Sequence, residues 1–116
     1  MTLETYELKK GSHPERDKGM CAMEFVAYLA GEPHGDKPVC ASPLITTFVI
    51  SCNDNWTDEE RQLLKPYLPR IMGTRDGKDV ERARIFAMGA VTKITPHVIE
   101  LIGLKEHAEK MRSAET

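Results

Sequence analysis

The chain has 116 residues, of which 41% are hydrophobic and 29% are charged, and its formal net charge is −2. This length and this balance are those of one globular domain. The small negative charge argues against a general nucleic-acid-binding protein, because such proteins carry a strong surplus of basic residues.

Hydropathy and cysteine content bear on the compartment. No apolar run approaches the ~18 residues that a membrane span needs, and no basic start followed by an apolar stretch marks a secretory signal. Three cysteines, Cys21, Cys40 and Cys52, are an odd number, which favours reduced thiols over a disulfide framework. We therefore expect no membrane partner and a cytoplasmic location, in the protein's own cell or in a host.

Composition divides the chain into three stretches. Residues 1–18 are polar, contain glycine and proline, and are expected to form an extended arm. Residues 19–104 carry the apolar helical patterns and are expected to form the domain itself. Residues 105–116 are charged and are expected to form a tail.

The first predicted helix covers about residues 20–30, where apolar side chains recur at helical spacing. Its buried stripe would be made by Cys21, Phe25, Tyr28 and Leu29. Pro33 prevents the helix from continuing, and the connection that follows, GEPHGDKPVCA, is rich in turn-forming residues.

The second predicted helix begins at Ser42, a favourable N-cap, with Pro43 at the first helical position. The alternative is a buried strand, because ITTFVI is rich in β-branched residues. The cap and the proline favour the helix. The apolar residues that fit one of its faces are Leu44, Ile45, Phe48, Val49 and Cys52.

Three more helices complete the pattern. Thr57 and Glu60 form a capping box, T-x-x-E, at the start of the third. A loop over residues 73–79 leads to a helix over about residues 78–94, and a further threonine–proline pair opens the last one, over 95–103. The sequence therefore predicts an all-α fold, a compact irregular or orthogonal bundle of about five short helices.

One hypothesis about chemistry concerns a cysteine nucleophile. Cys21 would lie in the first turn of a helix, where the helix dipole lowers the pKa of a thiol. His34 or His97 would then act as base, and Asp36 would orient it. Free cysteine is, however, among the most buried residue types, so we expect Cys21 to serve packing and predict no catalytic residue.

Metal-ligand residue types gather in the same region, at Cys21, His34, Asp36 and Cys40. Structural zinc sites use paired ligands spaced as C-x₂-C or H-x₃-H, and these spacings are absent. The sequence therefore predicts no metal site and no cofactor.

A second hypothesis concerns an anion-binding loop, within PRIMGTRDGKDVERAR at residues 69–84. Its glycines precede a helix N-terminus, where free backbone N–H groups attract anions, and its basic side chains add positive charge. It is not a P-loop, because G-x-x-x-G-K is one residue too short and no Ser or Thr follows the lysine. The alternative is a plain polar loop. The candidate ligand-binding residues, from this loop and from the hinge region after the first helix, are Arg70, Thr74, Arg75, Lys78, Glu24, Tyr28 and Asp36.

Part of the chain also resembles a family of small bacterial and phage proteins to which no activity is assigned. The shared pattern is M-C-x-M-E-x-V-A-Y-x-A-G-E-P, then D-x-P-x-C-x-x-P, then P-x-x-x-G-T. The family has a tryptophan or another large residue where this chain has His34, which implies that His34 is not an essential base. The matching residues are Met20, Cys21, Met23, Glu24, Val26, Ala27, Tyr28, Ala30, Gly31, Glu32, Pro33, Asp36, Pro38, Cys40, Pro43, Pro69, Gly73 and Thr74.

The phage members of the family imply one functional class, small proteins that bind a host factor or sequester a nucleotide signal against host defence. The leading expectation is thus a non-catalytic binding protein, a homo-oligomer, whose ligand is an anionic, nucleotide-type small molecule or a host protein. The alternatives are a cysteine-dependent enzyme that uses Cys21, and a structural module of a larger assembly.

Overall fold

The computed structural model describes residues 1–94, 96, 100, 101, 103 and 105–113. Every regular element of these residues is helical, so the predicted all-α class is confirmed. The chain divides into two compact units, Met1–Gly77 and Lys78–Thr116, and the division falls inside the span 19–104. In chain order the elements are η1 (Arg16–Lys18), α1 (Ala22–Leu29), α2 (Pro43–Asn55), α3 (Asp58–Arg61), η2 (Gln62–Tyr67), α4 (Leu68–Ile71), α5 (Asp79–Gly89), η3 (Ala90–Ile94) and α7 (Lys105–Arg112).

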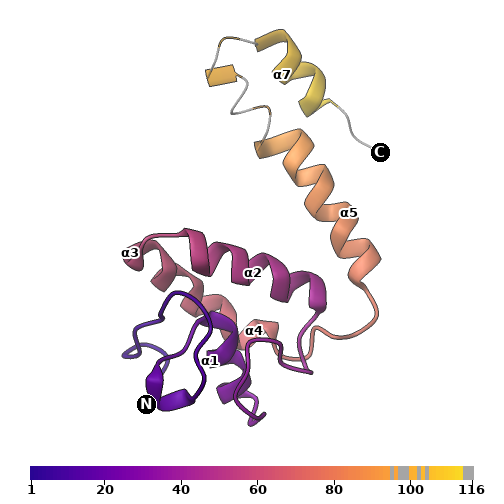
Figure 1. Ribbon diagram of the computed structural model, residues 1–116. Coiled ribbons are helices and arrows are strands. Elements are labelled where there is room, and N and C mark those ends of the chain that lie inside the picture. The colour runs from indigo at the N-terminus through magenta and orange to yellow at the C-terminus, as the bar shows by residue number, and fades with distance from the viewer. Residues whose placement is uncertain (95, 97–99, 102, 104, 114–116) are drawn as a thin grey trace. The chain divides into compact units, whose positions relative to one another are not determined.

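Helix α1 is the centre of the first unit, where it packs against α2 and α4 (Figure 1). A capping box starts it: the Cys21 thiol accepts a hydrogen bond from the Glu24 N–H, and the Glu24 carboxylate accepts one from the Cys21 N–H. Six consecutive residues, Ala22 to Ala27, are buried. The predicted stripe is therefore too narrow, since almost the whole helix is enclosed.

Helix α2 starts as predicted, with the Ser42 hydroxyl accepting a hydrogen bond from the Ile45 N–H and Pro43 in the first helical position. The strand alternative is wrong. The predicted buried face is wrong in part, because Phe48 is 55% exposed whereas Thr46 and Asn53 are buried. The helix is rotated so that Asn53 reaches the interior, where its amide bonds two other segments.

In the segment after α2, the helices begin and end where its capping residues and its prolines indicate. The Thr57–Glu60 capping box is present at the start of α3. Pro66 and a second proline then interrupt regular α-helix, so the chain continues as the 3₁₀ helix η2 and the short helix α4. Leu64 and Leu68 are buried there, and they belong to the same hydrophobic core as the buried residues of α1.

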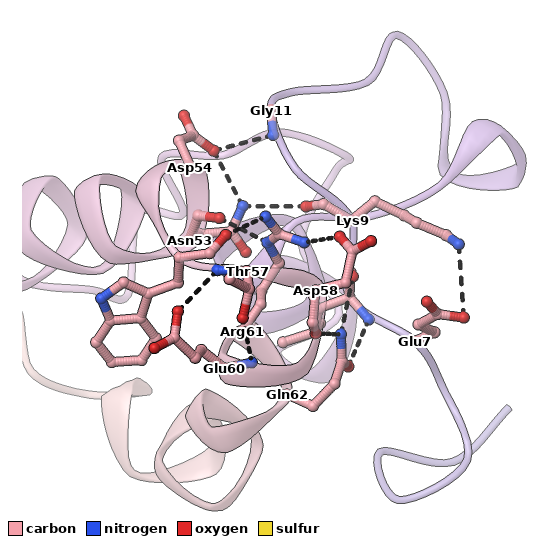
Figure 2. A network of polar contacts seen from close by, with 12 residues as sticks. Glu7, Lys9, Gly11, Asn53, Asp54, Thr57, Asp58, Glu60, Arg61 and Gln62 are labelled. Carbon is pink, nitrogen blue, oxygen red and sulfur yellow. Dashed lines mark hydrogen bonds and ion pairs between the residues drawn. The ribbon is translucent and has the colours of Figure 1, made fainter.

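Residues 8–11 of the N-terminal arm are hydrogen-bonded to α2 and η2 (Figure 2). Gln62 bonds both backbone groups of Leu8, accepting from its N–H at 2.9 Å and donating to its carbonyl at 3.1 Å. Asn53 donates to the Lys9 carbonyl at 3.0 Å, and Asp54 accepts from the Gly11 N–H at 2.9 Å. The arm is thus an integral layer of the first unit, with Leu8 fully buried.

The second unit begins at α5, which covers most of the predicted helix 78–94 and continues as the π-helix η3. No residue of α5 is buried, and Val80 is 85% exposed. The helix predicted over 95–103 lies largely outside the described residues. The charged tail contains α7, which buries Ala108. No described helix is long and apolar enough to cross a membrane.

Candidate functional site

A cavity of about 240 Å³ lies beside α2 in the first unit. One side is α2 itself, the other is the turn over residues 37–41, and Arg75 from the following loop completes the lining. We refer to it as the Lys37–Arg75 cavity. It is lined by Lys37, Pro38, Ala41, Pro43, Thr46, Thr47, Ile50 and Arg75.

Two cations, Lys37 and Arg75, give the cavity its charge. Neither makes an ion pair with any residue that the structure describes. Both side chains are exposed, so their charged ends are available to a ligand. Arg75 is a predicted ligand-binding residue. Lys37 is not, although it directly follows Asp36 in the same turn.

Two threonines of α2 also line the cavity, and their hydroxyls differ in their hydrogen bonds. The Thr47 hydroxyl donates to the Pro43 carbonyl at 3.0 Å, a bond within α2. Thr46 is only 5% exposed, and within the described residues its hydroxyl makes no hydrogen bond. Because this hydroxyl belongs to the lining of the cavity and can both donate and accept, Thr46 is suited to bond a ligand.

The rest of the lining is apolar: two proline rings, the Ala41 methyl group and the Ile50 side chain. The two prolines hold fixed backbone angles, and Ala41 is buried. The cavity therefore offers an apolar surface beside two cations and a hydroxyl. This is the composition expected of a small-molecule site, mostly apolar with a few polar groups.

Backbone hydrogen bonds join the turn of residues 37–41 to the loop that carries Arg75. The Cys40 carbonyl accepts from the Gly73 N–H at 3.1 Å and from the Arg75 N–H at 3.2 Å. Thr74 adds a second connection, since its hydroxyl accepts a hydrogen bond from the Ser42 N–H at 2.8 Å and donates one to the Ile71 carbonyl at 2.6 Å. These bonds fix both walls of the cavity relative to α2.

The predicted ligand-binding residues therefore divide between places. Arg75 lines the cavity, and the Thr74 hydroxyl connects the same loop to Ser42 by a hydrogen bond. Asp36 lies in the adjoining turn and Arg70 is exposed on α4, but neither lines the cavity. Lys78 is the N-cap residue of α5 and belongs to the second unit.

Tyr28 and Glu24 take part in contacts inside the first unit. The guanidinium carbon of Arg16 lies 5.3 Å from the centre of the Tyr28 ring, and Phe25 packs against that ring edge-on at 5.5 Å. Tyr28 thus belongs to the packing around α1.

Glu24 is the centre of a buried polar cluster formed with His13, Cys21 and His34. Its carboxylate is 1% exposed. It accepts from the His13 N–H at 2.8 Å, from the His13 Nδ1 at 2.9 Å and from the Cys21 N–H at 2.8 Å. Burial alone would raise the pKa of Glu24, but the hydrogen bonds from Cys21 and His13 outweigh it, so the pKa lies below its ordinary value.

His34 joins the same cluster from the hinge. Its Nε2 lies 2.8 Å from the His13 carbonyl oxygen, to which it must donate, and 3.2 Å from the Glu24 carboxylate. The imidazole thus ties the hinge to the N-terminal arm through its Nε2. That use differs from the role of a base acting on Cys21. His97, the other predicted base, lies outside the described residues.

Cys21 is enclosed and protonated. It is 3% exposed, and burial, with the nearby Glu24 carboxylate, raises the pKa of its thiol to about 12. Reactive cysteines have lowered pKa values and some exposure. These properties fit the expectation that Cys21 serves packing, and they argue against its action as a nucleophile at neutral pH.

Other chemistry finds little support. Within the described ranges, no group of three or more His, Cys, Asp or Glu residues could hold a metal ion. All three cysteines are free thiols. A larger hollow of about 390 Å³ lies along α5 and η3, and the described residues that line it all belong to the helical run 84–93.

Comparisons with known proteins give no assignment: no family model, no curated protein and no solved structure matches this chain. The case for a function therefore depends on the geometry of this chain alone. Sequence reasoning selected Arg75 but missed Lys37 and Thr46. The available signal for Lys37 was its place in the turn G-D-K-P. Thr46 gave none, because it was masked by the apolar pattern of α2.

Proposed function

We propose that this chain is a binding protein for a small organic anion, which it holds in the Lys37–Arg75 cavity. The observation that carries the proposal is that one cavity is lined by two cations and the Thr46 hydroxyl, none of which has an ion-pair or hydrogen-bond partner for its side chain among the described residues. The formal net charge of the chain is −2, so a positive site of this kind is local and does not follow from overall charge.

The size and lining of the cavity limit the ligand. About 240 Å³ is slightly below the roughly 300–1,000 Å³ of drug-sized sites, so the ligand is small or only partly enclosed. Arginine binds carboxylate and phosphate groups through two parallel hydrogen bonds, and the prolines and Ile50 suit an apolar or flat remainder. Mononucleotides, cyclic ones included, and small organic phosphates or carboxylates fit this description.

Sequestration is the biological role that we attach to this binding, following the resemblance to phage proteins. A sequestering protein, such as one directed against a nucleotide signal of host defence, binds its ligand without converting it. Incubation with the ligand followed by chromatography tests this part, and the ligand should be recovered unchanged. Conversion of the ligand by the pure protein would contradict it and favour an enzyme. Capture of a host protein and a cytoplasmic location stay predictions from the sequence.

Calorimetric titration against a panel of mononucleotides, sugar phosphates and small carboxylates tests the binding. Lys37→Gln and Arg75→Gln should each weaken the tightest interaction about tenfold or more, since a hydrogen bond to a charged group contributes roughly 1.5–3 kcal/mol. Lys10→Gln is a matched control on an exposed lysine of the arm, and it should leave affinity unchanged.

Arg70→Gln separates the cavity from the wider loop that the sequence predicted. If the ligand binds in the Lys37–Arg75 cavity, this variant keeps wild-type affinity. A loss with Arg70→Gln but not with Lys37→Gln would place the anion at the 69–84 loop and contradict the cavity. Absence of any binding by the wild-type chain across the panel would contradict the function itself.

A further inference from the structure

The side chain of Glu32 is hydrogen-bonded to the backbone of the turn that carries Lys37. Glu32 follows α1, and its carboxylate accepts hydrogen bonds from two consecutive backbone groups, the Val39 N–H at 2.6 Å and the Cys40 N–H at 3.0 Å. Glu32 itself does not line the cavity.

The same turn reaches Arg75 through Cys40. The Cys40 carbonyl accepts from both the Gly73 N–H and the Arg75 N–H, at 3.1 and 3.2 Å. A continuous chain of bonds therefore runs from the Glu32 carboxylate, through the peptide groups of residues 39 and 40, to the backbone of Arg75. Arg75 lies at the end of this chain, and Lys37 precedes Val39 by two residues in the same turn.

We propose that Glu32 is the positioning residue of the Lys37–Arg75 cavity, fixing the separation of its two cations without touching the ligand. This inference rests on the proposed function. Its physical basis is that two cations bind one anion well only if their spacing is set in advance, since a flexible loop would have to be ordered at the moment of binding. Hydrogen bonds from N–H groups to a carboxylate are among the strong ones, so Glu32 is suited to hold the turn.

The chemistry explains why a glutamate is needed there. Both carboxylate oxygens accept, one from each N–H group. A glutamine has one acceptor oxygen, and its NH₂ group is a donor, so it would face one of the two N–H groups donor to donor. Glu32→Gln keeps the size of the side chain and removes one of the two bonds.

Acid should act through the same residue. The hydrogen bond from the Cys40 thiol, and then those from the Val39 and Cys40 N–H groups, lower the pKa of Glu32 below its ordinary value. The charged group that contacts this residue is the Arg16 guanidinium, which donates to the Glu32 carbonyl at 3.0 Å. Anion affinity should thus be constant near neutral pH and fall as pH drops through the lowered pKa of Glu32.

Sulfate is the probe for the test, because it keeps its charge across the range in which carboxylates titrate. Its affinity is measured by calorimetry for the wild type, for Glu32→Gln and for Glu59→Gln, a matched control on an exposed residue of α3. Glu32→Gln should weaken sulfate binding about tenfold, as expected for the loss of one charge-assisted hydrogen bond. It should also abolish the acid-dependent loss of affinity, whereas Glu59→Gln should behave as the wild type does.

The outcomes separate the two proposals. Equal sulfate affinity and equal pH profiles for Glu32→Gln and the wild type overturn the role of Glu32 and leave the binding function intact. Failure of the wild type to bind sulfate and every member of the panel overturns the function, and the positioning role with it. If Glu32→Gln does not fold, the wild-type pH profile decides: affinity that does not fall in acid contradicts the inference.

Discussion

At the scale of single residues, some charged side chains are buried and stabilise the fold, whereas others are exposed and can bind a ligand. Glu24 accepts from His13 and Cys21 and is enclosed, whereas Lys37 and Arg75 are exposed beside a cavity. Charge that is buried and fully bonded contributes to the uniqueness of a core. An exposed charge at the edge of an apolar cavity can instead bind a charged ligand.

The state of Cys21 gives a direct chemical prediction. Because burial and Glu24 raise the pKa of its thiol to about 12, almost none is thiolate at neutral pH, and the side chain is 3% exposed. Under native conditions Cys21 should therefore react with iodoacetamide more slowly than the half-buried Cys40, and it should react readily in denaturant. Mass spectrometry of timed digests measures this. Faster labelling of Cys21 than of Cys40 in the native protein would revive the nucleophile hypothesis.

Glu24 should make the stability of the fold depend on pH. Its folded-state pKa lies below the ordinary value, so its contribution is present above that ordinary value and is lost as pH falls through the folded-state pKa. Glu24→Gln, which leaves N–H donors without an acceptor, should lower the free energy of unfolding at neutral pH by roughly 2–3 kcal/mol.

Urea unfolding at a series of pH values checks both parts. The gap in unfolding free energy between the wild type and Glu24→Gln should narrow in acid, while Glu4→Gln, at an exposed position of the arm, should match the wild type throughout. A gap that stays constant or widens as pH falls would show that the Glu24 charge is not what stabilises the cluster.

At the scale of elements, local signals in the sequence were sufficient where they act over a few residues. Ser42 with Pro43, and Thr57 with Glu60, predict helix starts that the structure contains. The orientation of α2 was not predictable in this way. The apolar pattern favoured Phe48, but Asn53 is the residue turned inward, because its bonds to distant backbone groups decide the rotation.

Asn53 therefore supplies a test at this scale. Its Oδ1 accepts from the Ala22 N–H at 3.0 Å and its Nδ2 donates to the Lys9 carbonyl at 3.0 Å, so one amide joins α2, the start of α1 and the arm. Asn53→Leu should lower the free energy of unfolding by about 2–4 kcal/mol, since buried groups lose their partners. Denaturant titration measures it.

Asn55→Leu is the matched control, because Asn55 is in the same helix and is exposed. It should change the unfolding free energy by less than about 0.5 kcal/mol. If the two variants are equally stable, the inward orientation of α2 described above is incorrect.

In the candidate site too, local sequence patterns predict some of the residues, whereas others depend on contacts between distant segments. Arg75 was predictable from a basic loop after glycines, and it does line the cavity. Lys37 and Thr46 were not, because the cavity is made by joining residues 37–41 to residue 75 through Cys40. No spacing within the chain encodes a pairing of segments more than thirty residues apart.

At the scale of the whole molecule, the homo-oligomer stays a prediction from the sequence. Val80, Ile85 and Ile94 of the second unit are 85%, 65% and 66% exposed, and Ile85 is the middle one of the three, so it is the position chosen for the test. Light scattering after size exclusion should give a multiple of the monomer mass. Ile85→Glu should reduce it to the monomer mass, whereas Glu81→Gln on the same helix should not. A wild-type monomer at every concentration would contradict the prediction.

The most direct test of the central claim is a ¹H–¹⁵N NMR titration with the tightest anion of the panel. Binding in the Lys37–Arg75 cavity predicts that the largest shifts fall on backbone amides of residues 37–41, on the first two turns of α2 and on residues 73–75, with the amides of α7 unmoved. Shifts confined to the second unit, or no saturable shift at any anion concentration, would contradict the account.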